Sequence, residues 1–173
     1  KKLVMNNKKA IRNVIVLAVA QAFLGAQMPM LFILGGLAGQ HLTPNPCFST
    51  LPVSMIIIGS TISAPFLSVF MQKFGRKYGF MIGTLCGALG ASIASYALIE
   101  GSFTLFILGS GINGVYMSSY GFYRFAATDL ASPNFRPKAI SYVMAAGLIS
   151  AVYGPQIVKL TSETLPIPFL GAY

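Results

Sequence analysis

Residues 13–72 read NVIVLAVAQAFLGAQMPMLFILGGLAGQHLTPNPCFSTLPVSMIIIGSTISAPFLSVFMQ and contain no lysine, arginine, aspartate or glutamate. An uncharged apolar run of about 18 residues is already enough to indicate a membrane span. This stretch is far longer than one span requires. It therefore predicts at least two helices that cross a lipid bilayer.

The composition of the whole chain also indicates a membrane protein. Of its 173 residues, 55 % are hydrophobic and 9 % are charged, whereas about 25 % are charged in an average soluble domain. Only three residues are acidic, Glu100, Asp129 and Glu163, so the chain cannot form the mixed-charge surface of a soluble protein. Intrinsic disorder is excluded as well, because disorder requires low hydrophobicity.

Five apolar runs are each long enough to cross about 30 Å of hydrocarbon at about 1.5 Å per residue. We expect an all-α membrane protein, a transmembrane helix bundle with five visible spans. The spans cover Val14–Ala38, Leu51–Met71, Tyr78–Ile99, Phe103–Tyr123 and Ala139–Val158. They divide the chain into a basic cytoplasmic N-terminus (residues 1–13), the five-helix bundle (14–158) and an extracytoplasmic loop (159–173) that leads to an expected sixth span.

The basic residues gather at the ends of the apolar runs. Eleven of the twelve lie before the first span, between the second and third, or between the fourth and fifth. Because positive charges stay on the cytoplasmic side, this distribution predicts an integral membrane protein with its N-terminus in the cytoplasm. It also accounts for the net charge of +9 without nucleic acid, so the expected partner is the lipid bilayer.

The fourth span carries most of its polar groups on one face. At about 100° per residue, Asn113, Tyr116 and Tyr120 fall on one arc narrower than about 100°. This face predicts a wet cavity, with these three residues as the candidates for its lining. Two alternatives remain open, since tyrosine rings also anchor at the membrane interface and since Asn113 and Tyr116 are equally suited to hydrogen bonds between helices.

Gln21 and Gln27 are the clearly polar side chains of the first span. Their positions differ by about 240° around a helix, so both cannot face one point. We expect one of them to line the cavity and the other to bond a neighbouring helix.

Small residues and prolines predict how the spans pack and bend. Gly83, Gly87 and Ala91 recur every four positions in the third span, a spacing that allows close approach of another helix. Pro29 in the first span and Pro155 in the fifth each remove a backbone donor and favour a kink.

Enzyme chemistry finds little support in this sequence. Three acids and one histidine provide no paired carboxylates, no nucleophile with a base, and no cluster of metal ligands. We expect a protein that is not an enzyme and that has no cofactor and no metal.

The loop between the second and third spans reads SVFMQKFGRK over residues 68–77. It resembles the signature loop of the major facilitator superfamily, G-x-x-x-D-[RK]-x-G-R-[RK]. The two agree at Lys73, Gly75, Arg76 and Lys77, and they differ at Ser68 and Gln72. The resemblance implies a cytoplasmic gate formed by Gln72 with these four residues, although Gln72 cannot neutralise an arginine as the family's aspartate does.

The fifth span reads SAVYGP from Ser150 to Pro155, similar to the family's G-x-x-x-G-P element, which implies that Gly154 and Pro155 take part in helix packing. The arginine that the family usually carries in the middle of its fourth span is missing, because Arg124 lies at the end of the run. The resemblance covers nearly the whole chain as spans one to five of a six-helix N-terminal half.

Membership of this family would imply secondary active or facilitative transport of a small organic solute by alternating access. The first and fourth helices would contribute to the site, and a second six-helix half would come from the same polypeptide or from another chain. Two alternatives stay open, a non-transporting accessory or scaffold subunit of a larger membrane complex and a half-size transporter that acts as a dimer.

Overall fold

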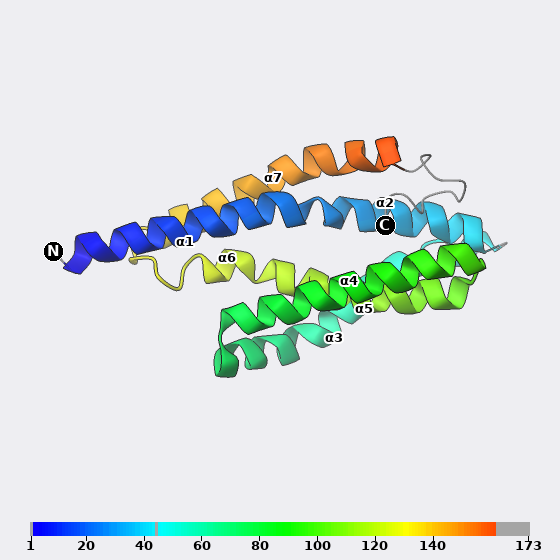
Figure 1. The fold of residues 1–173 in the computed structure, drawn as a ribbon, viewed down its shortest axis with the longest axis horizontal. Helices are drawn as coiled ribbons and strands as arrows, with labels where there is room; N and C mark the ends of the chain where they lie inside the picture. Colours follow the sequence, from blue (N-terminus) through cyan, green and yellow to red (C-terminus); the bar gives the residue numbers. More distant parts are fainter. Residues whose placement is uncertain (1, 44, 162–173) are drawn as a thin grey trace.

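The computed structural model describes residues 2–43 and 45–161, which are helical with short turns and contain no β-strand. The helices lie roughly along one axis (Figure 1). Their bounds are α1 (Lys2–Gly25), α2 (Gln27–Leu42), the short 3-10 helix η1 (Pro46–Phe48), α3 (Leu51–Phe74), α4 (Arg76–Glu100), α5 (Phe103–Gly121), α6 (Tyr123–Ala126) and α7 (Arg136–Thr161). The predicted all-α class is confirmed.

Four helical stretches within the described residues are long and apolar enough to cross a membrane, namely Lys9–Leu42, Pro46–Phe74, Arg76–Glu100 and Arg136–Thr161. The remaining predicted span corresponds to α5 and the short α6 that follows it. Helix α5 is not one of these four stretches. It carries Asn113, Tyr116 and several serines, and these side chains are buried against neighbouring helices.

The helix ends differ from the predicted span ends. Helix α1 begins inside the basic N-terminus, and α7 begins three residues before Ala139 and continues to Thr161. Helices continue beyond the apolar runs because polar residues at a membrane surface are still able to form backbone hydrogen bonds within a helix. The expected loop and sixth span lie almost entirely in residues 162–173, outside the described residues.

Helix α5 lies between α3 and α4 and packs closely on both. A Cβ atom added at Gly114 would lie 2.5 Å from the backbone of α3 at Ile56 and Ser60, and one added at Gly109 would lie 2.9 Å from the backbone of α4. Only glycine permits such approach, and close contact gives membrane helices their van der Waals attraction. Helices α3, α5 and α4 therefore form one tightly packed layer (Figure 1).

The small residues of α4 form the seam with α5. Gly83 packs on Ser119, and Gly87 packs on the ring of Tyr116, where an added Cβ would lie 3.0 Å from ring carbons. One turn later the buried residue is Gly90 rather than Ala91, because a helix repeats every 3.6 residues and not every four. Ala91 lies beside the seam and lines a cavity instead.

The other layer contains α1, α2 and α7. Helix α1 packs along α7, and α2 continues along the same helix (Figure 1). Their contact contains a core of buried apolar side chains, including Val14, Leu17, Ala139 and Val143.

The first span is interrupted in its middle. The helix is interrupted at Ala26, between α1 and α2 and three residues before Pro29, and it bends there, since the two parts lie at a shallow angle to each other in Figure 1. Because Pro29 has no N–H group, the carbonyl of Gly25 loses its helical donor, and the bend falls on the preceding turn. The helix recovers at once, since the N–H of Met30 donates to the Ala26 carbonyl at 3.4 Å.

Gly75 is the single residue between α3 and α4. Its φ of 93° and ψ of 158° lie in a region open to glycine and strained for other residues. This glycine allows two long helices to reverse direction within one residue.

Candidate functional site

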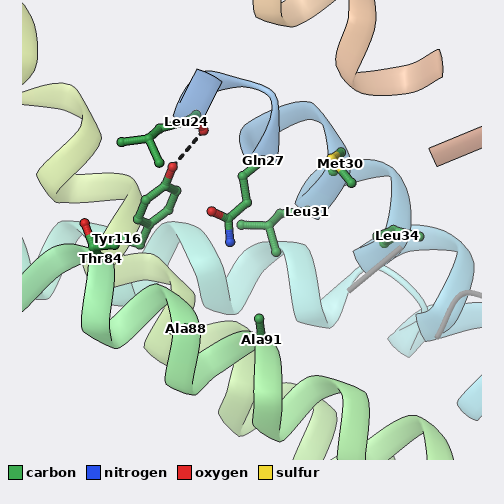
Figure 2. Close-up of a pocket in the computed structure, with 9 residues that line it drawn as sticks. All are labelled: Leu24, Gln27, Met30, Leu31, Leu34, Thr84, Ala88, Ala91 and Tyr116. Atoms are coloured by element: carbon green, nitrogen blue, oxygen red, sulfur yellow. Dashed lines mark hydrogen bonds between the residues drawn. The ribbon is translucent and has the colours of Figure 1, made fainter. Parts of the chain in front are cut away.

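Two cavities lie on opposite sides of the first span. We call the first the Gln27 cavity; it has a volume of about 360 Å³ and lies between α2, α4 and α5 (Figure 2). Its lining comprises Leu24, Gln27, Met30, Leu31, Leu34, Thr84, Ala88, Ala91 and Tyr116.

The polar groups of the Gln27 cavity are largely occupied by the protein itself. The hydroxyl of Tyr116 donates to the Leu24 carbonyl at 2.7 Å, as Figure 2 shows. The hydroxyl of Thr84 donates to the Phe80 carbonyl at 2.9 Å. The side chain of Gln27 points into the space between α2 and α4 (Figure 2), so its amide is the principal polar group that this cavity offers.

The second cavity, which we call the Gln21 cavity, has a volume of about 410 Å³ and lies between the first span, α5 with α6, and α7. Its lining comprises Gln21, Met28, Phe32, Met117, Tyr120, Gly121, Arg124, Met144, Gly147 and Leu148. Three methionines and a phenylalanine give it adaptable, polarisable walls, and the remaining side chains include an amide, a phenol and a guanidinium. Such a mixture of apolar walls with a few polar groups is typical of small-molecule sites.

Gln21 is the buried polar side chain of this cavity. Only 8 % of its surface is exposed, and its Oε1 atom has no hydrogen-bond partner among the described residues. Leaving a buried acceptor unpaired costs about 1–3 kcal/mol. A ligand that brings an N–H or O–H group to this oxygen would remove that cost.

Tyr120 and Arg124 complete the polar part of the Gln21 cavity. The Tyr120 hydroxyl lies beside the side chains of Gln21 and Ser150. The exposed Arg124 side chain lies on the short helix α6, with its guanidinium 5.0 Å from the centre of the Phe125 ring. Within the described residues, the ion pair formed by Asp129 is with Arg76 and not with Arg124.

Asn113 lies in neither cavity. It is fully buried where α5 meets α4, and its Cγ atom is 2.9 Å from the position of a Cβ added at Gly90. Neither amide atom of Asn113 has a hydrogen-bond partner in the described structure.

The structure thus divides the five cavity candidates into three groups. Gln21 and Tyr120 share one cavity, Gln27 and Tyr116 share the other, and Asn113 is buried between helices. The separation arises because the first span crosses α5 between the two tyrosines. Leu24 accepts from Tyr116, while the next residue, Gly25, has the Tyr120 hydroxyl 2.7 Å from the position of its Cβ.

The signature loop is fastened by an acid from a distant segment. Nε of Arg76 lies 3.0 Å from Oδ2 of Asp129, and Nη2 lies 3.3 Å from Oδ1. Gln72, Lys73 and Lys77 are exposed. Asp129 was not among the sequence candidates, although its place as one of only three acids is a signal that could have identified it.

A side-chain hydrogen bond also joins helix α1 to helix α6. Nδ2 of Asn13 donates to the Ala126 carbonyl at 3.2 Å.

No group of three histidine, cysteine, aspartate or glutamate side chains in residues 2–43 and 45–161 is placed to hold a metal ion.

Comparison with known proteins supports the resemblance to the major facilitator superfamily. The family described as "Sugar (and other) transporter" matches residues 40–122. The chain is 41 % identical over 163 residues to the riboflavin transporter RfnT of Brucella anthropi, covering 94 % of this chain and 41 % of that protein. It is 30 % identical to two uncharacterized MFS-type transporters of Bacillus subtilis, YdeG and YddS, covering 88 % and 86 % of this chain. No solved structure matches the chain.

The chain spans 41 % or less of the length of these relatives. The three relatives match nearly all of this chain. This chain is therefore similar, over nearly all of its length, to transporters of the major facilitator superfamily, which are not enzymes.

Proposed function

We propose that this chain forms one side of the path of a transporter that moves a small organic solute by alternating access. In this proposal the protein lies in the bacterial inner membrane, with the basic end of the bundle in the cytoplasm. A second six-helix half, from the same polypeptide or another chain, closes the path. The single observation that carries the proposal is Gln21, whose unpartnered oxygen is buried in a cavity of about 410 Å³ between three helices.

The chemistry of the Gln21 cavity favours a flat heteroaromatic solute. Thioethers and the Phe32 ring make favourable contacts with aromatic rings, and three methionines line this cavity. Oε1 of Gln21 would accept from an N–H group on the edge of the solute. A relative that is 41 % identical is a riboflavin transporter, and riboflavin is a flat ring system with a polar edge, so riboflavin is the first solute to test.

The test uses the complete transporter in proteoliposomes and measures the uptake of labelled riboflavin. Gln21→Leu is compared with Gln27→Leu, the same substitution on the same span but in the other cavity. Loss of one buried hydrogen bond of about 1–3 kcal/mol should raise KM about 5- to 150-fold for Gln21→Leu. Gln27→Leu should leave KM within about twofold of the unsubstituted protein.

Two results would contradict the proposal. Equal KM values for Gln21→Leu and the unsubstituted protein would remove Gln21 from the site. If riboflavin is not taken up, a panel of heteroaromatic solutes tested by thermal stabilisation of the purified transporter decides the substrate class, and the absence of any stabilising member would refute a heteroaromatic substrate.

A further inference from the structure

Three consecutive backbone carbonyls at the end of α1 lie within hydrogen-bond reach of two tyrosine hydroxyls from other helices. The Tyr116 hydroxyl on α5 donates to Leu24 at 2.7 Å (Figure 2). The Tyr153 hydroxyl on α7 contacts the carbonyl of Ala22 and lies 3.3 Å from that of Phe23. The two tyrosines therefore bind one short segment of the first span from two different helices.

This segment ends at the bend between α1 and α2. The last carbonyls of a helix lack intrahelical donors, and a proline in the next helix removes a further donor. A phenolic hydroxyl in an apolar interior needs a partner. Both needs are met at the same place, because the hydroxyls reach the carbonyls directly before the bend at Ala26.

The bend is also seated closely on α7. A Cβ added at Gly25 would clash with the Ser150 side chain, and one added at Gly154 would lie 2.8 Å from Cγ of Pro29 and 2.9 Å from the Ala26 carbonyl. Ser150 and Gly154 lie one helical turn apart, as the two ends of the S-x-x-x-G element. The bent segment thus has packed contacts on one helix and hydrogen bonds to two.

We infer that Tyr116 and Tyr153 are positioning residues that set the bend of the first span. Their hydroxyls favour the bent form seen here, and a straighter form requires that these hydrogen bonds break. The Gln21 and Gln27 cavities lie on the two sides of this span, so a change in the bend alters both. The link to turnover rests on the proposed transport function; the control of the bend does not.

Removal of either hydroxyl should shift the balance between bent and straighter forms. The net contribution of one hydrogen bond corresponds to about a 2- to 10-fold change in an equilibrium. Tyr116→Phe and Tyr153→Phe keep the rings and remove only the donors. Each should raise the straighter population about 2- to 10-fold, and the double variant should raise it by about the product of the two factors if the bonds act independently.

The experiment measures spin-label distances in the complete transporter in lipid nanodiscs. Labels are placed at Gln40→Cys on α2 and Thr104→Cys on α5, two exposed positions on different layers of the bundle, in a background with Cys47→Ser and Cys86→Ala. Tyr142→Phe is the matched control, since Tyr142 lies on α7 with an exposed side chain. Pro29→Ala, which supplies a donor for the Gly25 carbonyl, should shift the distances in the same direction as the tyrosine variants.

The outcomes separate this inference from the proposed function. Distance distributions in Tyr116→Phe and Tyr153→Phe equal to that of Tyr142→Phe would overturn the inference, whatever the uptake. A shifted distribution with no transport of any solute would support the inference and count against the proposed function. In a functional transporter, the variants should change the maximal rate of transport while the dissociation constant of the solute stays within about threefold. An unchanged maximal rate with shifted distances would show that the bend does not control turnover.

Discussion

Arg76 and Asp129 lie 53 positions apart in the sequence and form a two-point ion pair at the basic end of the bundle. The pair joins the single-residue turn between α3 and α4 to the segment between α6 and α7. The family's loop carries an aspartate where this chain has Gln72, and here Asp129 provides the acid for Arg76. Both side chains are partly exposed, at 36 % and 43 %, so water weakens their attraction.

The ion pair should contribute little to stability on its own. We expect a double-mutant cycle with Arg76→Gln and Asp129→Asn to give a coupling of about 0.2–1 kcal/mol in the free energy of unfolding. The measurement is thermal unfolding of the complete transporter in detergent at low salt. The coupling should fall as salt is raised, and a coupling that is independent of salt would show that the pair is not electrostatic.

Gly114 should tolerate no side chain. In Gly114→Ala the new methyl group meets the α3 backbone at 2.5 Å, and backbone cannot shift as a flexible side chain does. Gly111→Ala is the control in the same helix, since its nearest contact is Met55 at an ordinary 3.8 Å. Thermal unfolding should show a loss of more than about 1 kcal/mol for Gly114→Ala and no loss for Gly111→Ala, and equal midpoints would contradict the close approach of α3 and α5.

Gly75 should be required for its backbone conformation. Its φ of 93° would impose about 1–3 kcal/mol of strain on alanine. Gly101 provides the comparison, because its φ of 65° and ψ of 24° are left-handed helical values that asparagine tolerates. We expect Gly75→Ala to lower the unfolding midpoint and Gly101→Asn to leave it nearly unchanged, and the reverse order would refute the assignment of strain to Gly75.

Asn113 should affect stability rather than solute affinity. It lines neither cavity, and both of its amide atoms are buried without partners. Asn113→Ala should therefore leave the dissociation constant of the solute within about twofold, whereas Gln21→Ala should weaken it about 5-fold or more. Calorimetric titration of the purified transporter measures both constants, and a weakened constant for Asn113→Ala would place Asn113 in the site.

Helix class and packing glycines could be predicted from the sequence because they depend on local properties. Hydropathy marks the apolar runs, and the glycines at 83 and 87 mark a face on which another helix lies. The strict four-residue spacing led to Ala91, however, while the seam follows the true helical repeat to Gly90. Over several turns, positions spaced four residues apart therefore move off the helix face that contacts the neighbouring helix, because the helix repeats every 3.6 residues.

The division of the cavity candidates could not be predicted in this way. Tyr116 and Tyr120 are only about 40° apart on a helical wheel, yet each faces a different cavity. The two tyrosines are separated because the first span crosses α5 between them, and a helical wheel of one helix does not show where another helix crosses it. For the same reason the sequence gives no direct sign that Tyr153 reaches the carbonyls of the first span or that Asp129 reaches Arg76.

The contacts within each packed layer are more extensive than the contacts between the two layers. In the layer of α3, α5 and α4, the backbones of neighbouring helices contact each other directly at glycines such as Gly114 and Gly109. These contacts leave little space for the three helices to shift against one another. The layer of α1, α2 and α7 meets it with far fewer contacts, and a hydrogen bond from Tyr116 is one of the ties across the boundary. A relative movement of the two layers would therefore break fewer contacts than a rearrangement inside the layer of α3, α5 and α4.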